Sequence, residues 1–475
     1  STGKLFVPDS ACNSMMSYDD VARADRNYEY FVGDLWTLMQ NAGARVAEYV
    51  SASQGDGKKV LVVAGNGNNG GDGIVAGTLL SGKNTVSLFP ISGPYGMKTR
   101  DSRHAMRDYR GRFMDMQSFM EEASSYHVII DAIFGSGFSG EPRPPYDAII
   151  RKINESGAYI VSVDVPSALG SSMPVKPDAT VTFTDSKTGM TPENSGKIVV
   201  ADIGIPEKVF THNGPGEFVY FRKSEKSSHK GMNGRAAIIG GWTYHGSAVI
   251  ASGGAMAVGS DLVKIYTTGL NYPIISSYDP GIIVRNLDLE VPHEEVMNND
   301  SILVGSGLGK GQDVHFITGL VKGFTGTIVL DAEGLDFHRQ IREAAPGSRI
   351  IMTPHTGEFQ RISGLEPTAE NAAAFARSTG SCVILKGVVD TVTDGKVTRF
   401  TEGGNPRMTM GGTGDLLAGL VTGLAARTAD PFRASCMASF LNKSAGDFCQ
   451  RQKSLWYSVT DMIHAIPDLM IQYVG

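Results

Sequence analysis

Apolar residues recur along this 475-residue chain with two different periods, and the alternation of the two predicts its elements. From about residue 18 to residue 55 they recur every three or four positions, which is the spacing of one helix face. Short apolar runs then alternate with further helical stretches. The runs predict strands at 59–64, 85–91, 127–133, 158–164, 179–183 and 198–203. Alternating strands and helices are typical of a mostly parallel sheet with helices on both faces.

The pattern of apolar residues is interrupted near the middle of the chain, where the polar, charged stretch 222–230 predicts a linker or a domain edge. The alternation then starts again and ends in two long helices, at about 411–427 and 432–452. Strands of this second half are predicted at 235–240, 262–267, 300–304, 326–331, 349–353, 382–386 and 390–393. We therefore predict an α/β protein with two domains, at residues 15–215 and 225–475.

Composition and charge are those of an ordinary globular protein, with 41% hydrophobic and 19% charged residues. The net charge of −6 is mild and there is no basic run, so no nucleic-acid partner is expected.

No apolar run is long enough to span a membrane and no signal peptide is visible, so we expect no membrane partner and a cytoplasmic location. Residues 1–14 lack a pattern and stay outside the predicted fold. Four cysteines without CxxC or zinc spacing are typical of thiols in a reducing cytoplasm: Cys12, Cys382, Cys436 and Cys449.

Residues 411–415, Gly-Gly-Thr-Gly-Asp, precede the apolar run 416–421 and predict a glycine loop that enters a buried helix. Free backbone N–H groups and the positive end of the helix dipole make such a place an anion site. A carboxylate at Asp415 would repel a phosphate there, so it needs a chemical task. We interpret Asp415 as a base that takes a proton from a hydroxyl attacking a phosphoryl group, with a helix N-cap as the alternative.

A second glycine loop lies at residues 65–73, directly after the predicted strand 59–64. Strand, glycine loop and helix follow in the dinucleotide-binding order, although the spacing differs from GxGxxG. Backbone N–H groups of such a loop would hold a phosphate of a dinucleotide; a turn that only packs strand against helix is the alternative. The residues assigned to this role are Asn68, Asn69, Gly70, Gly71 and Asp72.

Polar residues also end two later strands of the first half. Asp131 ends one strand, and Asp164 and Ser167 follow the next. Carboxyl ends of parallel strands share one edge of the sheet, where ligands bind. Oxygen donors gathered there, from Asn69, Asp131 and Ser167, would suit a hard cation, with a helix cap or an ion pair as the alternative for Asp131. A further glycine loop follows Asp131 and is also assigned to the site: Gly135, Ser136 and Gly137.

These motifs, in this order, resemble a known family. The first half is similar to NAD(P)H-hydrate epimerase domains, and the second to NAD(P)H-hydrate dehydratase domains of the ribokinase-like superfamily. Their fusion resembles the bifunctional NAD(P)H-hydrate repair enzymes of prokaryotes over about residues 15–470. The resemblance implies a Rossmann-like three-layer sandwich followed by a ribokinase-like α/β domain. It is carried by residues 41–43, 68–73, 131–137, 164–167, 229–231, 353–358, 385–387, 404–406 and 411–415.

For the first half the resemblance implies inversion at C6 of the hydrated nicotinamide ring of NADHX or NADPHX. It also implies a potassium ion, held by Asn69, Asp131 and Ser167. We assign Asp164 as the acid/base group because it lies at the ligand edge of the predicted sheet. The family usually has Gly where Ala168 stands, which affects the geometry of this loop.

For the second half the resemblance implies phosphorylation of the C6 hydroxyl and then loss of phosphate, which leaves far better than hydroxide. Asp415 would take the hydroxyl proton, and loop amides would stabilise the transferred phosphoryl group. The fused, prokaryote-like architecture favours ADP over ATP as the donor, with Mg²⁺ on the nucleotide. Substrate contacts are expected at Gly307 and His355. Nucleotide contacts are expected at Lys386, Gly387, Asn405, Gly411, Gly412, Thr413 and Gly414.

Alternatives stay open at this point. His355 fits a core or capping histidine, Glu358 a first-turn acid, and Lys386 an exposed loop lysine. A competing hypothesis is a ribokinase-like small-molecule kinase whose first domain binds a nucleotide without catalysis; a third is a first domain that only senses a ligand. The sequence has no Walker A motif, which argues against a P-loop kinase. We also expect a homo-oligomer, as for relatives of this kind.

Overall fold

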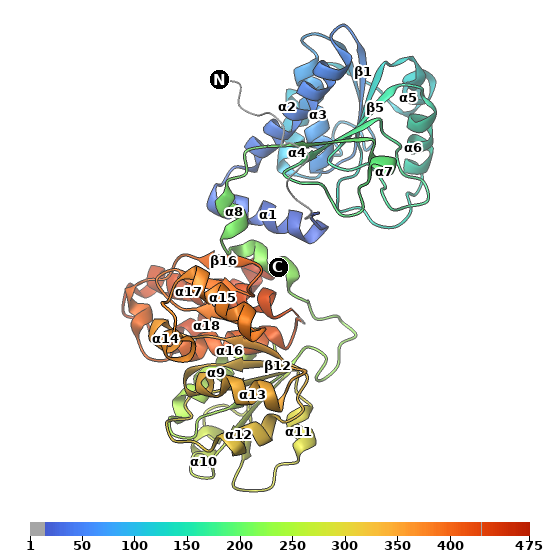
Figure 1. The fold of residues 1–475 in the computed structure, drawn as a ribbon. Coiled ribbons are helices and arrows are strands. Elements are labelled where there is room, and N and C mark those ends of the chain that lie inside the picture. The colour runs from blue at the N-terminus through green and yellow to red at the C-terminus, as the bar shows by residue number, and fades with distance from the viewer. Residues whose placement is uncertain (1–14, 429) are drawn as a thin grey trace. The chain divides into compact units, whose positions relative to one another are not determined.

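The computed structural model describes residues 15–428 and 430–475, which form two compact units divided between Glu207 and Lys208 (Figure 1). The division lies before the polar stretch 222–230 that marked the expected domain edge. Phe218 explains the earlier boundary, because this residue is buried in the core of the second unit. The prediction about residues 1–14, and that about Cys12, lie outside the described residues. The other three cysteines are buried, free thiols.

The first unit contains a seven-stranded sheet in which every described pairing is parallel. The predicted strands are confirmed to within two residues at their ends. The sequence missed a two-residue edge strand because both of its residues are exposed and make no apolar run. The strand order is β3 (Arg112–Phe113), β2 (Thr85–Pro90), β1 (Lys59–Ala64), β4 (Val128–Ala132), β5 (Tyr159–Val163), β6 (Ala179–Phe183) and β7 (Lys197–Ala201).

Helices cover both faces of this sheet. On one face Leu61 and Val63 pack with α5 and α6; on the other, Gly77 lets α3 approach Val62 closely. The single helical stretch expected at 18–55 is two helices, because Gly33 takes a positive φ of 114° and Asp34 caps a new helix. The helices are α1 (Tyr18–Phe31), α2 (Leu35–Gln54), α3 (Asn68–Leu80), α4 (Arg100–Asp108), α5 (Met116–Glu122), α6 (Tyr146–Glu155), α7 (Pro192–Ser195) and α8 (Glu207–Thr211), with a 3-10 turn at Ala123–Ser125.

The second unit is built on a nine-stranded sheet that is parallel except at one edge, where the last three strands run antiparallel. Two edge strands were not predicted, since their side chains are mostly half-buried and show no clear alternation. The strand order is β10 (Ile283–Asn286), β9 (Leu262–Thr267), β8 (Arg235–Ile239), β11 (Ser301–Val304), β12 (Thr327–Leu330), β13 (Arg349–Met352), β14 (Cys382–Leu385), β15 (Asp390–Thr393) and β16 (Thr398–Thr401).

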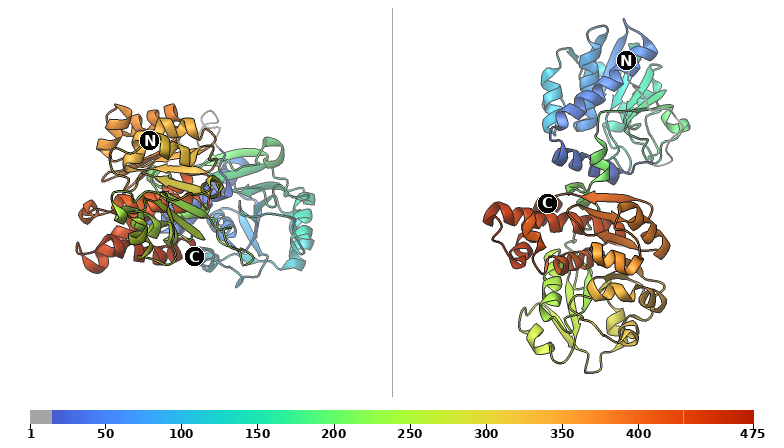
Figure 2. Two further views of the ribbon diagram at one scale, coloured as in Figure 1. Left: turned by 90° about the horizontal axis from the view of Figure 1, so that it is seen from below. Right: turned by 60° about the vertical axis from the view of Figure 1, so that its left-hand side comes forward.

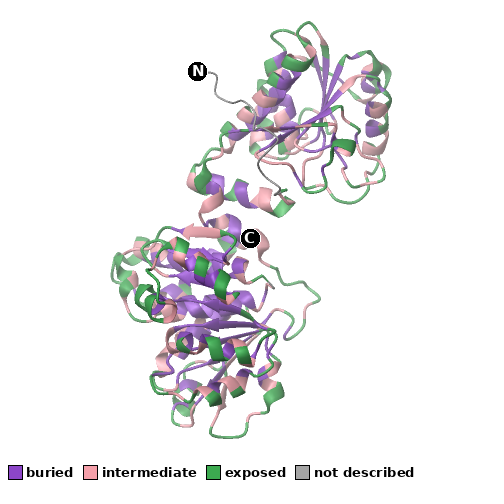
Figure 3. Cartoon of the chain, in the orientation of Figure 1, coloured by how far each residue is buried: buried purple, intermediate pink, exposed green. Residues whose placement is uncertain are grey.

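Two layers of helices enclose this second sheet, whose strands are largely buried (Figures 2 and 3). One layer contains α9 (His245–Ala257), α16 (Thr413–Ala425), α17 (Pro431–Lys453) and α18 (Val459–Val474). The other contains α11 (His293–Met297), α12 (Val314–Val321), α13 (His338–Ala344), α14 (Thr356–Ser363) and α15 (Ala369–Thr379). Shorter elements are α10 (Tyr272–Ser276), η2 (Pro215–Tyr220), η3 (Ala332–Phe337) and η4 (Pro406–Thr409). None of the described helices is both long and apolar enough to cross a membrane.

Each sheet reverses its strand order once, and ligands of open α/β sheets bind at such a reversal. In the first sheet the chain runs from β1 outward through β2 and β3, then returns to place β4 on the other side of β1. In the second it runs outward from β8 and returns to place β11 beside it. The glycine loops that follow β1, β4 and β11 lie at these reversals, so the fold places them at the expected ligand edges.

Candidate functional site

A cavity of about 630 Å³ opens at the carboxyl end of the first sheet. Its walls come from α1, α2, the start of α3 and the loops after β1, β4, β5 and β6. Residues expected in the site do line it, namely Asn68, Asn69, Asp72, Gly135, Ser136, Gly137 and Asp164. Gly70 and Gly71 do not line it but are buried in α3. The loops that the sequence singled out therefore share one cavity.

The glycine loop after β1 is shaped by close backbone contacts. A Cβ atom on Gly65 would lie 2.0 Å from the carbonyl oxygen of Ile133, and one on Gly70 would lie 2.0 Å from that of Gly65. Helix α3 starts at Asn68, so its first amides have no helical partner and face the loop end as an anion site. The Gly71 amide instead donates to the Gly67 carbonyl at 3.2 Å. The backbone amides expected to bind a phosphate are thus limited to those of residues before Gly71.

Asp164 and Lys187 form an ion pair on the cavity wall, with 2.9 Å between Oδ1 and Nζ. The lysine also donates to Thr182 Oγ1 and to the carbonyl oxygens of Phe183 and Asp185 at 2.8–3.0 Å. Asp164 has a left-handed backbone with φ of 67°, which a non-glycine residue adopts at some cost. The strained backbone aims this carboxylate at the cavity and at its lysine.

Two further carboxylates line the same cavity. Burial, the charge of Asp164 and the charge of Asp25 raise the pKa of Asp72 well above its ordinary value. Burial and then Asp164 raise the pKa of Asp25 to about 6, while Lys187 acts in the opposite direction. Lys187 and Asp25 were not found from sequence. Lys187 sits in a loop without a motif, and Asp25 only interrupts the apolar face of α1, which was the one available signal.

Asp131 is fully buried beneath the cavity and accepts four hydrogen bonds, one of them from the Ile133 amide at 3.4 Å. It accepts from Ser162 Oγ, from the Ser167 amide and from Ser167 Oγ. Burial raises its pKa, although the bonds from Ser167 and Ser162 oppose this. Ser167 Oγ also accepts from the Phe134 amide and lies near the Phe134 carbonyl oxygen, at 3.4 Å. The predicted cation ligands Asp131 and Ser167 are therefore in direct contact.

The side chain of Asn69 completes this group. Its amide oxygen and nitrogen are buried, and neither has a hydrogen-bond partner among the described residues. The Asn69 side chain lies against Gly135, one residue after Phe134. Buried amide atoms without partners are rare, because each costs the free energy of a lost hydrogen bond. The unsatisfied Asn69 oxygen, the Asp131 carboxylate, the Ser167 hydroxyl and the Phe134 carbonyl are oxygen groups of the kinds that hard cations prefer.

Asp415 lies in the first turn of α16, at the carboxyl edge of the second sheet. The N-cap is Gly412, with φ of 98°, so the interpretation of Asp415 as an N-cap is wrong. Burial and then the charge of Asp331 raise the pKa of Asp415 to about 6, while Ser247, Lys386 and Ser306 lower it. A carboxylate with a raised pKa at a helix N-terminus fits a proton acceptor beside an anion site.

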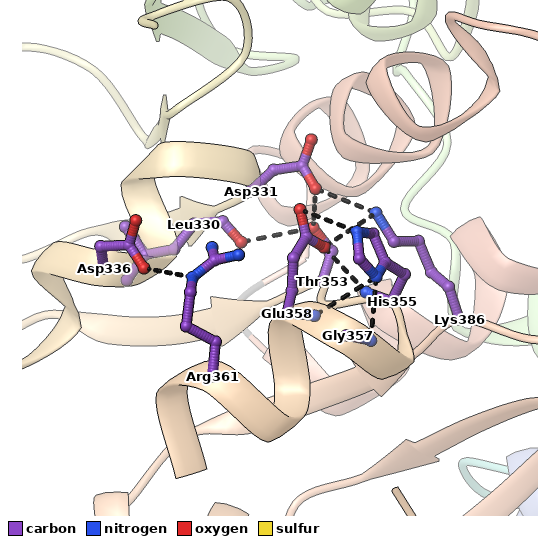
Figure 4. Close-up of polar contacts among 9 residues, drawn as sticks. All are labelled: Leu330, Asp331, Asp336, Thr353, His355, Gly357, Glu358, Arg361 and Lys386. Carbon is purple, nitrogen blue, oxygen red and sulfur yellow. Dashed lines mark hydrogen bonds and ion pairs between the residues drawn. The ribbon is translucent and has the colours of Figure 1, made fainter. Parts of the chain in front are cut away.

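Lys386 lies between the carboxylates of Asp331 and Glu358, as Figure 4 shows. Its Nζ lies 3.2 Å from Asp331 Oδ1 and 3.9 Å from Glu358 Oε2. Burial lowers the pKa of Lys386, but Asp331 and Glu358 outweigh it and the pKa rises. Nζ also lies 3.4 Å from where a Cβ on Gly414 would be. Lys386 thus faces the glycine loop instead of open solvent.

His355 caps helix α14 (Figure 4). Its Nδ1 accepts from the amides of Gly357 and Glu358, and the Glu358 carboxylate accepts from the His355 amide at 2.8 Å. The capping alternative is therefore correct for the Nδ1 side of the ring, while 59% of the side chain is exposed. Glu358 is likewise a capping-box acid. The second carboxylate oxygen of Glu358 lies 3.5 Å from His355 Nε2. The two residues that cap the helix therefore also contact each other beside the candidate site.

Hydrogen bonds support the loops that carry the remaining residues expected to contact the nucleotide. Asn405 Oδ1 accepts from Tyr457 Oη at 2.7 Å and from the Arg407 amide, so its side chain mainly orders the loop before 411–414. Thr413 Oγ1 donates to the Met408 carbonyl. The Gly387 carbonyl accepts from Lys443 Nζ at 2.8 Å. Gly411 and Gly414 stay clear of packing, apart from Lys386 beside Gly414.

Gly307 follows β11 with φ of 73°, and a Cβ there would lie 2.2 Å from the Tyr244 carbonyl. Its own carbonyl accepts from the amides of Thr243 and Tyr244. This contact brings the loop after β11 against the start of α9, which supplies Ser247 beside Asp415. Ser247 was not found from sequence, because a single serine at a helix start carries no specific signal.

Comparisons with known proteins agree with this division of the chain. Residues 36–189 match a family model described as YjeF-related protein N-terminus, and residues 236–468 match one described as NAD(P)H-hydrate dehydratase. A bifunctional NAD(P)H-hydrate repair enzyme of Archaeoglobus fulgidus is 34% identical over 472 residues, covering 96% of this chain and 98% of the relative. One of Hyperthermus butylicus is 32% identical over 492 residues, covering 95% and 91%.

A solved structure gives the same picture for the fold of the second unit. A ribokinase-like superfamily protein of Enterococcus faecalis superposes with a TM-score of 0.51 at 24% identity, covering 55% of this chain and 96% of that protein. The prediction of a ribokinase-like second domain is thereby confirmed at the level of the fold.

Proposed function

This chain belongs to the family of bifunctional NAD(P)H-hydrate repair enzymes, and from this premise we propose which groups of its two units carry the two reactions. The first unit interconverts the R and S hydrates of NAD(P)H in the cavity around Asp164. The second unit restores NAD(P)H from the S hydrate at the N-terminus of α16. The observation that supports the second assignment best is the position of Asp415 in the first turn of α16, directly after the glycine loop, where Lys386 Nζ lies 3.4 Å from the place that a Cβ on Gly414 would take.

In the second unit Asp415 accepts the proton of the C6 hydroxyl as that oxygen attacks the terminal phosphoryl group of the nucleotide. Amides of the 411–414 loop and the Lys386 ammonium stabilise the charge that develops on the phosphoryl oxygens. The ring nitrogen then expels the phosphate from C6, and the C5 proton is lost, which restores the dihydronicotinamide. Hydroxide would leave far more slowly than phosphate, which is why a kinase-like site serves a dehydration.

We propose ADP as the phosphate donor, with Mg²⁺ carried on its phosphates. No group of three or more His, Cys, Asp or Glu side chains suited to a metal ion occurs among residues 15–428 and 430–475. Asp331 and Glu358 are both occupied by Lys386. Magnesium commonly binds through substrate phosphates and waters with few protein ligands, so an ion that arrives with the nucleotide would need little from the protein.

In the first unit the amides at the start of α3 hold the pyrophosphate, and the nicotinamide ring reaches Asp164. Lys187 holds the Asp164 carboxylate in an ion pair and keeps it correctly aimed. A potassium ion would be held by Asn69, Asp131, Ser167 and the Phe134 carbonyl, where it would supply charge and rigidity beneath the loop. The unsatisfied Asn69 oxygen supports this assignment.

An equal mixture of the two hydrates tests the proposal. With ADP, complete recovery of near-ultraviolet absorbance means that both units work, whereas recovery of half means that only the dehydratase works. Repeating the assay with ATP identifies the preferred donor. A stable phosphorylated product without recovery of absorbance would instead indicate a small-molecule kinase.

The potassium assignment has its own test. Thermal unfolding of the first unit should shift upward in potassium relative to tetramethylammonium, which is too large for the site. Ser167→Ala should remove this difference, while Ser136→Ala, on the cavity rim, should keep it. A shift of equal size in both variants would count against these ligands. The homo-oligomer remains a prediction, which light scattering of the intact chain would check.

A further inference from the structure

Asp25 is an acidic residue on the apolar face of helix α1. Val21 lies one turn before it and the buried Tyr28 lies one turn after it. Val21, Ala24 and Asp25 all line the cavity of the first unit. The Asp25 side chain is exposed, and no described residue donates a hydrogen bond to it. Because Asp25 lines the cavity, its carboxylate is accessible to a molecule bound there.

The other ionisable groups around this cavity leave Asp25 without a counter-ion of its own. They are Asp72 on α3, Asp101 on α4, Asp164 after β5 and Lys187 after β6. Among the described residues that line the cavity, Lys187 is the only lysine or arginine, and it is paired with Asp164 at 2.9 Å. With a pKa raised to about 6, Asp25 exchanges its proton near neutral pH, which suits an acid/base group.

Asp25 and Asp164 reach the cavity from different elements. Asp164 projects from the edge of the sheet, while Asp25 projects from α1, a helix that contributes a separate wall. Inversion at a carbon needs such an arrangement. The hydroxyl leaves from one face of the ring and water adds to the other, so each face needs a group that moves a proton.

We propose that Asp25 is the second acid/base residue of the epimerase, serving the face of the nicotinamide ring opposite the Asp164–Lys187 pair. This inference rests on the proposed function of the cavity. In one direction protonated Asp25 gives its proton to the C6 hydroxyl. The C6–O bond breaks, water leaves, and the ring nitrogen lone pair forms a C6=N1 iminium bond.

Water then adds to C6 from the opposite face, and the electrons of the C6=N1 double bond return to nitrogen. Asp164 takes the proton released by the incoming water. One water leaves and one enters, so composition is unchanged and no oxidant or reductant is needed. In the reverse direction the two carboxylates exchange roles, and bulk water restores their protonation states between turnovers.

The test uses the full chain with Asp25→Asn, which preserves shape and removes the titration. Glu29→Gln is the matched control, because Glu29 is an exposed carboxylate one turn further along α1 and does not line this cavity. Each variant is assayed for interconversion of the separated hydrates, for entry of heavy oxygen from labelled water at C6, and for dehydration of the S hydrate with ADP. The last activity reports on the second unit, and thermal unfolding of the first unit shows whether that unit is folded.

We expect Asp25→Asn to slow interconversion by about 100-fold, within the range for loss of one acid/base group. One hydrate should still exchange its oxygen with retention of configuration, because Asp164 still serves its own face. In the direction in which protonated Asp25 gives its proton, the fall in rate as pH rises through about 6 should also disappear. Glu29→Gln should behave as wild type in all three assays.

Two outcomes would overturn the inference. One is interconversion at the wild-type rate with an unchanged pH profile. The other is an equal loss of inversion and oxygen exchange for both hydrates, which a structural or binding role would produce. Asp164→Asn separates this failure from failure of the proposed site. If Asp164→Asn also leaves interconversion unchanged, the cavity itself is not the epimerase site.

Discussion

Both units place a lysine among carboxylates at the carboxyl edge of a parallel sheet, but the lysine binds a different partner in each. In the first unit Lys187 pairs at 2.9 Å with Asp164, the proposed acid/base group. In the second unit Lys386 pairs at 3.2 Å with Asp331, while Asp415 keeps a pKa of about 6. In the first unit the lysine therefore pairs with the proposed acid/base group, whereas in the second it pairs with a different carboxylate.

The difference follows the charge that each proposed reaction brings. The dehydratase handles a phosphoryl group, so Lys386 has to remain close to the 411–414 loop while Asp415 stays able to take a proton. The epimerase moves only water and protons at the ring, so Lys187 can be committed to Asp164. The lesson is that the partner of the lysine, more than its presence, distinguishes the two sites.

Removing the proposed base of the second unit should give the largest effect. Asp415→Asn should lower the dehydratase rate by about 1,000-fold, since loss of general-base catalysis costs roughly 10²–10⁴. Epimerisation should be unchanged, because Asp415 belongs to the other unit. Recovery of absorbance from the S hydrate with ADP measures the first, and chromatography of the hydrates measures the second. Equal loss of both activities would contradict the separation of the sites.

Removing each lysine compares the two pairs directly. Lys187→Met should destabilise its unit by about 3–5 kcal/mol, because it leaves a nearly buried carboxylate and three acceptors unpaired. Lys386→Met should cost less stability, since 20% of this side chain is exposed, but it should weaken use of ADP. Hydrogen exchange by mass spectrometry locates each loss. The reverse order of stability losses would show that the second lysine is the structural one.

The pH dependence of dehydration should follow Asp415. Its pKa is raised to about 6, and only the ionised form accepts a proton. The value of kcat/KM should therefore fall about tenfold per pH unit below pH 6 and level off above it. Asp415→Glu has a carboxylate on a side chain one methylene longer. Its kcat/KM should still fall at low pH, with a shifted midpoint. A profile that is flat between about pH 5 and 7 would exclude Asp415 as the base.

The smallest effect should be a gain in the stability of the folded chain when the Asp415 carboxylate is removed. The folded pKa of Asp415 lies above its ordinary value of 3.8, so the folded state binds the proton more tightly and ionised Asp415 opposes folding above about pH 6. After allowing for partial solvent access, Asp415→Asn should stabilise by about 1–2 kcal/mol at neutral pH. The gain should vanish as pH falls towards 4. Thermal unfolding at the two pH values checks this, and an equal gain at both would contradict it.

Predictions from the sequence were most accurate where a residue's neighbours along the chain decide its state. The strands and their apolar runs are such a case, as is the glycine loop before Asp415. Prediction failed at Gly33, where a positive φ divides one helical pattern into two helices. It also left Ala168 uncertain. The structure gives Ala168 a φ of 61°, so alanine holds the left-handed backbone that glycine adopts more easily.

What the sequence determined by itself is the order of strands and helices, the loops at the carboxyl ends of the strands and the residue types that handle phosphate. These depend on spacing along one segment, and spacing is written in the chain. Only the tertiary structure decided that Lys187 pairs with Asp164, that Lys386 pairs with Asp331, and that Asp25 faces the first cavity. Such pairings join side chains from distant segments, and burial among those segments sets their pKa values, so no local pattern contains them.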